Sequence, residues 1–468
     1  MKHVAFAGRL VMLGCGSIGR GVLPLILRHI DIRPDQITIL TGDARGQDVA
    51  AEYGARFYVE PLGIDDYQAR LRPLLGRGDF LLNLSVEVSS VALIGFCNEI
   101  GALYLDTCIE PWAGGYTDPS LTPSQRSNYA LRESALALAA DFRNGPTAVL
   151  THGANPGLVS HLVKEALLNL ARDTGRDQPI PVVREEWAAL ARALDVKVIH
   201  IAERDTQSAD VAKRPGEFVN TWSIDGFVGE GCQPAELGWG SHENTWPADA
   251  RRHEFGRDSA IYLERPGAAT RVRTWTPLEG PFHGFLVTHN ESISISDYYT
   301  VAADGRVAYR PTVHYAYHPC DDAVLSLHEL AGKNWAMQPK QRLMMDEIAR
   351  GTDELGVLLM GHARGAYWYG SRLSIEEARR LAPHNNATSL QVTAMVLAGV
   401  IWAMENPRRG IVEPDEMDHA RVMQIGRPYL GEIVGVYSDW TPLQGRGGLF
   451  PEKTDDRDPW QFVNFRVV

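Results

Sequence analysis

Cysteine is scarce in this chain of 468 residues, and the five cysteines lie far apart. They stand at Cys15, Cys97, Cys108, Cys232 and Cys320, and no two of them have CxxC spacing. An odd number of widely spaced cysteines argues against a disulfide framework and against a structural zinc site. Free thiols are typical of a reducing compartment. We therefore expect a cytoplasmic protein with no bound metal.

Long apolar runs and an excess of positive charge are also missing. No run approaches the roughly 18 apolar residues of a transmembrane helix, so we expect no membrane span. The short apolar stretch at the N-terminus leads into a glycine-rich turn, which favours a strand over a signal peptide. The formal charge of −12 argues against nucleic acid, whose phosphates would be repelled. It suits a cationic small molecule, although acidity can serve solubility alone.

The chain does contain a long alternation of strand-like and helix-like segments. Its length predicts two or three domains, and its 44% hydrophobic residues are typical of a globular protein. Within the first 150 residues, strands are predicted at 10–13, 36–40, 79–84, 103–106 and 147–150, and helices at 18–30 and 124–142. This alternation predicts an α/β fold with a Rossmann-type, doubly wound parallel sheet.

The middle of the chain changes character. From about 196 to 311 it is rich in β-branched and aromatic residues, and VKVIHIAER, EFVNTWSIDGF, AIYLE, RVRTWT and GFLVTHNESISI are interpreted as strands of a mixed sheet. Helices are expected at 157–172 and 185–194, and a strongly apolar one at 389–405, buried between domains. We predict a nucleotide domain at 1–154, a mixed α/β substrate and dimerisation domain at 155–388, and a C-terminal segment at 389–468 that partly returns to the first domain.

A G-x-G-x-x-G motif stands at the first strand–helix junction. Gly14 would make the tight turn, Gly16 would let the backbone approach a pyrophosphate, and Gly19 would let helix and strand pack closely. Ser17 and Ile18 lie in the same loop, at the start of the helix. Phosphates would bind at the positive N-terminus of that helix. The position of the motif predicts a dinucleotide cofactor.

Three further residues are candidates for the cofactor crevice. Asp43 is the best candidate for a ribose contact, although Thr41 occupies the more usual position and Asp43 is equally plausible as a turn residue. The acidic Asp43 favours NAD over NADP, while Arg45 keeps NADP open. Asn83 and Ser85 follow the strand DFLLNLS and are expected to face the cofactor, unless they are ordinary turn residues.

Polar residues interrupt apolar surroundings at four places. Glu110 follows a short strand, and Asn155 stands where a strand becomes a helix, so both fall among the loops that line a crevice. Asn155 has the alternative role of capping the following helix. Glu203 shares one strand face with Ile199 and Ile201, where a carboxylate must be paired, protonated or next to a cavity.

Two more groups follow in the middle of the chain. Trp222 and Glu230 lie in NTWSIDGFVGEG, and His289 and Glu291 alternate in THNES, where a strand would point both side chains the same way. Each residue alone has a structural role as an alternative. Together, carboxylates that hold ammonium groups and an indole that attracts cations predict a site for a diamine.

His314, His318 and His362 do not predict a metal site. HxxxH on a strand-like segment does not place both imidazoles on one helix face.

Long segments of the sequence resemble the bacterial homospermidine synthases, within a superfamily similar to the saccharopine dehydrogenases. The resemblance extends from residue 12 to residue 450, which is nearly the whole chain. The matching segments include MLGCGSIGRG, LDTCIEPW, NYALRE, GANPG, IHIAERDTQ, FVNTWSIDGFV, PAELGWG, THNESISI, HYAYHPC, AYWYGS and VGVYSDWTPL. One departure is Thr41, where an acid would be expected.

The resemblance implies a transferase with no net redox. Tightly held NAD would oxidise putrescine, or spermidine as donor, to an imine. A second putrescine would attack this imine, and ammonia or diaminopropane would leave. The stored hydride would then reduce the new imine. It also implies a homodimer. The residues implied to shape the substrate tunnel are Glu110, Asn155, Glu203, Trp222, Glu230, His289, Glu291 and Asp353.

The resulting hypothesis gives each group a role. His289 and Glu291 orient the reacting amine and accept its proton, and Trp222 stabilises the iminium. Glu110 and Glu203 fix the distal ammonium group, and Glu230 supports the imine region. The alternatives are a net oxidoreductase acting on a secondary amine and a nucleotide-binding regulatory protein without catalysis.

Overall fold

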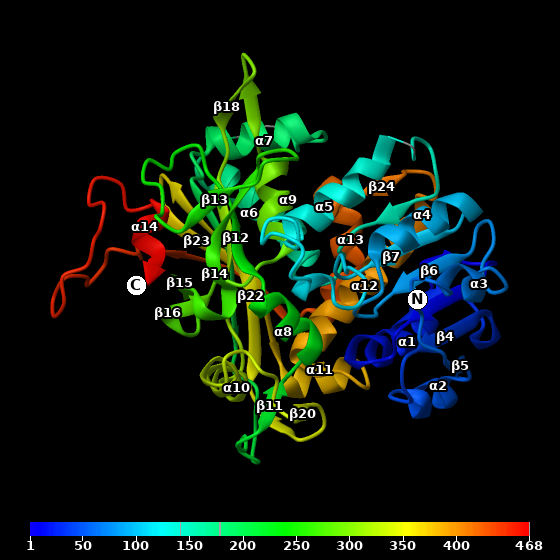
Figure 1. Cartoon of the computed structure of the whole chain (residues 1–468). Helices are drawn as coiled ribbons and strands as arrows, with labels where there is room; N and C mark the ends of the chain where they lie inside the picture. Colours follow the sequence, from blue (N-terminus) through cyan, green and yellow to red (C-terminus); the bar gives the residue numbers. More distant parts are fainter. Residues whose placement is uncertain (141, 177–178, 468) are drawn as a thin grey trace.

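The computed structural model describes residues 1–140, 142–176 and 179–467 (Figure 1). In that part of the chain the first half of the molecule is a seven-stranded sheet, ordered β24-β8-β7-β6-β2-β4-β5, in which every pairing is parallel and to which the C-terminal part of the chain contributes β24. Its strands are β2 (Leu10–Leu13), β4 (Ile37–Thr41), β5 (Arg56–Val59), β6 (Phe80–Asn83), β7 (Leu103–Asp106), β8 (Ala148–Val149) and β24 (Ile411–Val412). The predicted parallel sheet is confirmed.

Helices cover both faces of this sheet. The side chains of β2 alternate, so that Leu10 and Met12 join one apolar core and Val11 and Leu13 join another. The first core includes α1 and α12, and the second includes α4 and α5. The helices of this half are α1 (Ser17–His29), α2 (Gln47–Tyr53), α3 (Tyr67–Leu71), α4 (Ser90–Ile100) and α5 (Asn128–Ala137).

A mixed sheet of eleven described strands forms the second half. At its centre β9 (Val198–Asp205), buried along its whole length, pairs parallel with β19 (Thr312–His318) and antiparallel with β22 (Thr352–His362). The other strands of this sheet are β12 (Pro234–Gly238), β13 (Ala250–Arg252), β14 (Ala260–Pro266), β15 (Arg271–Thr276), β16 (Gly280–Phe285), β23 (Gly365–Ser374), β25 (Glu432–Ser438) and β26 (Arg466–Val467).

Helices and three short strand pairs of the described chain surround this sheet. The helices are α6 (Leu158–Asp173), α7 (Arg184–Ala193), α8 (Ile224–Cys232), α9 (Asn290–Tyr298), α10 (Asp321–Gly332), α11 (Ile375–Leu381), α13 (His419–Gly426) and α14 (Phe462–Phe465). The pairs are β10 (Ser208–Ala209) with β21 (Ile348–Arg350), β11 (Glu217–Asn220) with β20 (Lys340–Leu343), and β17 (Val301–Ala303) with β18 (Arg306–Tyr309).

Two predicted strands are wrong in part. EFVN forms β11, but Ile224–Cys232 is helical, because the hydroxyl of Ser223 caps α8 by accepting a hydrogen bond from the backbone N–H of Gly226. Likewise β16 stops at Phe285 and THNESISI leads into α9. Every residue of α9 is buried, so the helix has no exposed polar face that would indicate its helical period. The isoleucines of α9 alternate along the sequence, and this alternation predicts a strand. The predicted helix at 124–142 is also shorter, since α5 ends at Ala137, and residue 141 lies outside the described residues.

Helix α12 (Ala387–Glu405) lies between the two halves, where it packs against α1 on one side and α13 on another. By length and composition alone, this helix could cross a membrane. The sequence analysis expected no such helix, because Ser389, Gln391 and Thr393 interrupt its apolar run. However, 89% of the apolar stretch of α12 is buried inside the protein, as in a core helix.

The cap of α12 joins the halves by hydrogen bonds. The side-chain oxygen of Asn386 accepts from the N–H of Ser389 at 2.8 Å, and its amide nitrogen donates to the carbonyls of Thr221 at 2.6 Å and Met344 at 3.1 Å. Asn386 is fully buried, so these groups have no water as an alternative partner.

We expect Asn386→Ala to lower the free energy of unfolding by about 2–3 kcal/mol, since it removes a cap and leaves two buried carbonyls without a donor. Ser374→Ala, which removes only the cap of α11, is the control and should cost about 1 kcal/mol. Chemical denaturation measures both. Equal losses would contradict the linking role of Asn386.

Candidate functional site

A cavity of about 710 Å³ lies between the two halves and runs from the glycine loop after β2 to strands β9 and β19. Most predicted site residues line it. These are Gly14, Gly16, Ser17, Ile18, Gly19, Asp43, Ser85, Glu110, Asn155, Glu203, Trp222, Glu230 and His289. Asn83, Glu291 and Asp353 do not line it and lie behind residues that do.

The three glycines have different surroundings. Gly14 has a φ of 84°, and a Cβ there would lie 2.7 Å from the carbonyl oxygen of Leu84. A Cβ on Gly19 would lie 2.7 Å from the carbonyl oxygen of Gly14, whereas nothing lies within 4 Å of a Cβ on Gly16. The first turn of α1 has neither an acidic residue nor a side-chain cap. The loop therefore offers open backbone N–H groups to an anion, which fits a dinucleotide pyrophosphate.

The residues after β4 and β6 differ in their access to the cavity. Asp43 accepts hydrogen bonds from the backbone N–H of Arg45 at 2.8 Å and from its guanidinium Nε at 2.8 Å, so the carboxylate is engaged within its own turn. Asn83 is buried and accepts from the hydroxyl of Ser85 at 2.5 Å. Ser85 thus faces the cavity while Asn83 holds it in place.

Glu203 is the centre of the far end of the cavity. Its Oε2 accepts hydrogen bonds from Asn155 Nδ2 at 2.8 Å and from the hydroxyl of Tyr315. Asn155 is not a helix cap, since α6 begins after Gly157 without a side-chain cap. Burial raises the pKa of Glu203 to about 8, against which the Tyr315 hydrogen bond acts. A cationic ligand would favour its charged form.

Two more carboxyl groups lie beside Glu203. Asp205 points the same way along β9, and Asp353 on β22 stands opposite Asp205 in register. The Thr388 hydroxyl lies 2.5 Å from Asp353 Oδ2 and 3.4 Å from Asp205 Oδ2, and its single hydrogen can satisfy one of them at a time. Burial raises the pKa of both aspartates, and Asp353 Oδ1 has no partner among the described residues.

His289 lies between two carboxylates. Its Nε2 is 3.0 Å from Glu230 Oε2, and its Nδ1 is 3.2 Å from Glu291 Oε1. Burial alone would lower the pKa of His289, but Glu230 and Glu291 raise it well above its ordinary value. The predicted pairing of His289 with Glu291 is present. Its predicted geometry is wrong, because Glu291 lies in the first turn of α9, fully buried and behind His289.

Trp222 and Glu110 complete the wall of the cavity. The indole Nε1 of Trp222 donates to the hydroxyl of Tyr317 at 3.0 Å, which fixes the plane of the ring. The backbone of Glu110 is held by Ser90, whose Oγ accepts from the Glu110 N–H at 3.0 Å. Burial raises the pKa of Glu110 to about 7, and the charge of Glu230 adds to this.

Tyr315, Asp205 and Thr388 were missed by the sequence analysis. Tyr315 and Tyr317 alternate in HYAYH and stack with ring centroids 5.0 Å apart, a period-two pattern that could have placed them beside Glu203. Asp205 follows Glu203 at the same period.

His314 packs on His200 with ring centroids 4.0 Å apart. Within the described ranges, no group of three His, Cys, Asp or Glu side chains is arranged to hold a metal ion.

Comparison with known proteins identifies the family. The models of the saccharopine dehydrogenase NADP binding domain and C-terminal domain match residues 10–149 and 153–437. The homospermidine synthase of Blastochloris viridis is 55% identical over 464 residues, which is 98% of this chain and 97% of that protein. That of Mesorhizobium japonicum is 51% identical and covers 98% and 96%. The chain belongs to the homospermidine synthase family.

Solved structures agree with this family and its fold. The Legionella pneumophila homospermidine synthase in complex with NAD superposes with a TM-score of 0.93 at 51% identity, over 100% of this chain and 99% of that one. Yeast saccharopine dehydrogenase, at 11% identity and a TM-score of 0.53, shares the fold alone. The predicted family and fold class are confirmed.

The buried carboxyl groups of this family member predict how its stability depends on pH. Between 4.5, the ordinary pKa of a glutamate, and about 8, folded Glu203 retains a proton that the unfolded chain has lost. Stability therefore falls as the pH rises through this window, by up to about 1.4 kcal/mol per pH unit for one group.

Glu203→Gln should make this fall shallower and should leave the variant more stable than wild type at pH 8, as measured by urea denaturation across the window. The slope should not vanish, because Glu110 and Asp353 act in the same direction. Exposed Glu264→Gln is the control. A variant as sensitive to pH as wild type would disprove the assignment.

Proposed function

We propose that this chain makes homospermidine. It transfers an aminobutyl group from putrescine, or from spermidine, to a second putrescine through an imine, and releases ammonia or diaminopropane with no net redox. The observation that carries the proposal is the continuity of one cavity from a dinucleotide loop to a wall of Glu110, Glu203, Glu230 and Trp222.

The charge of the cavity argues against the net oxidoreductase. A substrate derived from amino acids carries carboxylates and requires Arg or Lys side chains next to it. Among the described residues that line the cavity, the Arg and Lys side chains are Arg20 on α1 and Arg45 after β4, both at the nucleotide end. The other end therefore suits a substrate with ammonium groups.

NAD fits the nucleotide end of the cavity. Gly14, Gly16, Ser17, Ile18 and Gly19 would hold its pyrophosphate, with Ser85 beside the crevice and Asp43 near the ribose. The homologue from Legionella pneumophila was solved with NAD, which supports the same cofactor here. When bound, NAD accepts a hydride from the amine and returns it to the new imine.

The protein's own groups would hold the amine and move its protons. Burial raises the pKa of Glu110 to about 7 and that of Glu203 to about 8, so each can exchange a proton with a substrate amine near neutral pH. Charged His289 donates to Glu230 and Glu291, so it holds Glu230 in place beside the imine. Trp222 faces the cation that develops on the substrate.

Asp353 and Asn155 would act through Glu203. The Asn155 amide holds one oxygen of that carboxyl group, and Asp205 and Asp353 lie behind it as two further buried carboxyl groups whose pKa values burial raises. An ammonium group at this end would favour the ionised forms of these acids.

Incubation with NAD and putrescine tests the proposal. We expect mass spectrometry to detect homospermidine, with no change in the absorbance of reduced nicotinamide during turnover. Trp222→Ala should lower kcat by about 10- to 100-fold and Trp222→Phe by less, because a smaller aromatic face remains. Trp246→Ala, at an exposed tryptophan, is the control. Net formation of reduced nicotinamide would favour the oxidoreductase, and no product would end the proposal.

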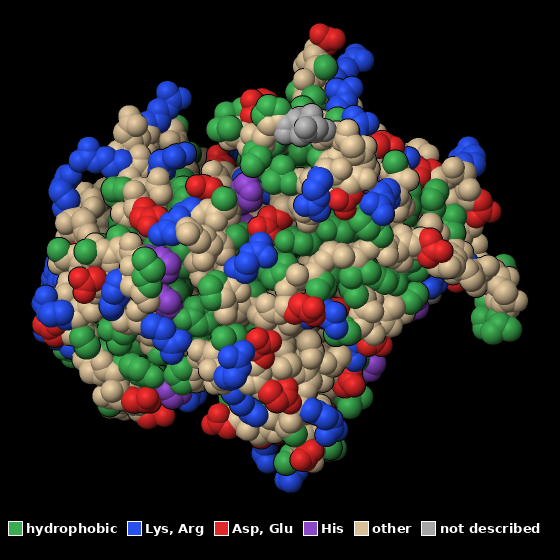
Figure 2. Space-filling model, turned by 180° about the vertical axis from the view of Figure 1, so that it is seen from behind, with side chains coloured by type: hydrophobic (Ala, Val, Ile, Leu, Met, Phe, Trp, Pro, Cys, Tyr) green, Lys and Arg blue, Asp and Glu red, His purple; other side chains and the backbone are tan. Residues whose placement is uncertain are grey.

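We also propose that the protein is a cytoplasmic homodimer. Its five cysteines are free, as in a reducing compartment. The C-terminal segment projects from the body of the protein (Figure 1), and a projecting tip ends in hydrophobic side chains (Figure 2). Leu449 and Phe450 in this segment are 90% and 78% exposed, which suits contact with a second copy.

The double variant L449S/F450S should weaken self-association by about 10- to 100-fold, because it removes two apolar anchors. Sedimentation of wild type and variant at several concentrations measures this. Val211→Ser, at an exposed valine elsewhere, should sediment as wild type does. Identical sedimentation of all three proteins would exclude this segment as the dimer contact.

A further inference from the structure

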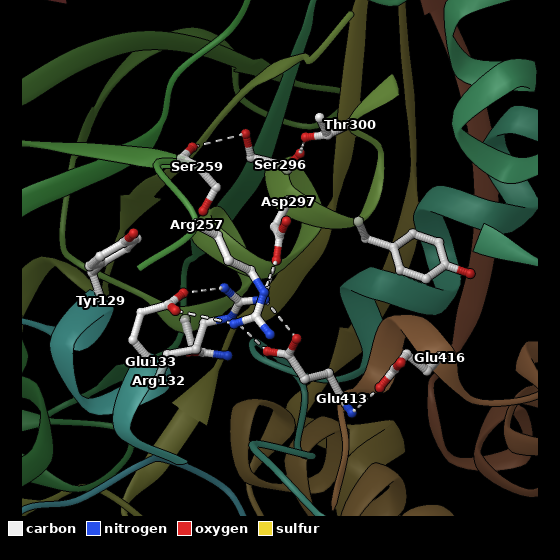
Figure 3. A network of polar contacts seen from close by, with 12 residues as sticks. Tyr129, Arg132, Glu133, Arg257, Ser259, Ser296, Asp297, Thr300, Glu413 and Glu416 are labelled. Carbon is white, nitrogen blue, oxygen red and sulfur yellow. Dashed lines mark hydrogen bonds and ion pairs between the residues drawn. The ribbon is translucent and has the colours of Figure 1, made fainter. Parts of the chain in front are cut away.

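A buried ion cluster joins α5 to α9 (Figure 3), and its residues are not among those that line the cavity. Arg132, in NYALRE, is 1% exposed and forms two parallel bonds of 2.7 Å to the carboxylate of Glu413. The same guanidinium donates to Asp297 at 2.8 Å and to Glu133 at 3.3 Å. The function proposed above does not account for this cluster.

The three anchored elements come from distant parts of the chain. Arg132 lies on α5, within the region that matches the nucleotide-binding domain. Glu413 follows β24, which extends the parallel sheet by pairing with β8. Asp297 lies in the last turn of α9, the helix that starts directly after His289. Arg132 therefore ties the helix behind His289 to the sheet that presents the glycine loop.

Helix α5 also holds the other end of α9. The backbone N–H of Asn128 donates to Glu236 at 2.9 Å, and Thr288, the residue before His289, donates to the same Glu236 oxygen at 2.7 Å. Asn128 and Arg132 thus contact the 288–298 segment near its beginning and near its end. A shift of α5 would move α9 as a whole.

The positive and negative charges of the ion cluster balance, and the geometry of its contacts requires an arginine at position 132. Arg184 and Arg257 add two positive charges against the three carboxylates, but their side chains are 42% and 43% exposed. Arg184 donates to the Asp297 carboxylate at 3.0 Å and to the carbonyls of Asp297 and Tyr298, while Arg257 lies 3.1 Å from Glu133 and 3.7 Å from Asp297. Burial would raise the pKa of Asp297, but Arg132 and Arg184 lower it. Only a planar guanidinium can form the two-bonded fork to Glu413 while it also reaches Asp297.

We propose that Arg132 is a positioning residue that sets the place of α9 and, through it, the place of His289 between Glu230 and Glu291. The inference rests on the proposed function for its kinetic part. The groups that face His289 are Glu230 on α8, Glu291 on α9, the ring of Tyr315 on β19 at a centroid distance of 4.3 Å, and the charge of Glu203 on β9. His289 directly precedes α9, whereas Glu230 lies on α8, so a displacement of α9 would move His289 away from Glu230.

Arg132→Lys tests the proposal, because it keeps the charge and loses the fork. The pKa of His289, followed by NMR titration and assigned with H289N, should fall, since a lost carboxylate contact no longer favours the imidazolium. kcat should drop by roughly 10- to 100-fold with a smaller change in KM for putrescine. Arg257→Lys, in the same cluster, is the control and should change neither quantity.

A His289 titration and kcat like those of wild type in R132K, with only a lower unfolding midpoint, would overturn the proposal and leave Arg132 a structural role. If R132K does not fold, the same titration in E413Q decides in the same two ways. The titration needs no substrate, so it stands apart from the product assay that tests the proposed function.

Discussion

Three carboxyl groups buried together are the constraint around which the rest of the molecule is arranged. Glu203, Asp205 and Asp353 meet where β9 and β22 run side by side, and the hydrogen bonds to their carboxyl oxygens come from neutral donors such as Asn155, the Gln207 N–H and Thr388. Such a cluster costs free energy in the empty protein, because burial disfavours the ionised form. A polycation that enters the cavity can recover that free energy as binding.

Helix packing and buried hydrogen bonds join the two halves and hold the buried carboxyl groups in place. Helix α12 packs against α1 and α13, and its cap reaches the second half through Asn386. Helix α5 holds the segment that begins with Thr288, since Asn128 and Thr288 donate to the same oxygen of Glu236. The charged wall and the glycine loop are therefore presented by one connected framework, in which the geometry between them does not depend on a flexible linker.

Much of the fold follows from sequence patterns, and the exceptions have physical causes. Strand β2, the glycine loop and Glu203 on β9 were predictable, because alternation and spacing are local signals. The helix α9 was not, since a helix buried on every side has no polar stripe. Glu291 was misplaced for the same reason. Thr388 and Asp353 meet only through tertiary packing across about thirty-five residues of chain, which a local pattern does not encode.

The turn after β4 has a consequence for cofactor choice over evolutionary time. The carboxylate of Asp43 accepts hydrogen bonds from both the backbone N–H and the guanidinium of Arg45, so the positive charge next to the crevice is neutralised by a neighbour in the same turn. Loss of this single carboxylate would release a cation suited to a 2′-phosphate. A lineage could thus exchange one dinucleotide for the other at the rim, with no change in the chemistry of the amine end.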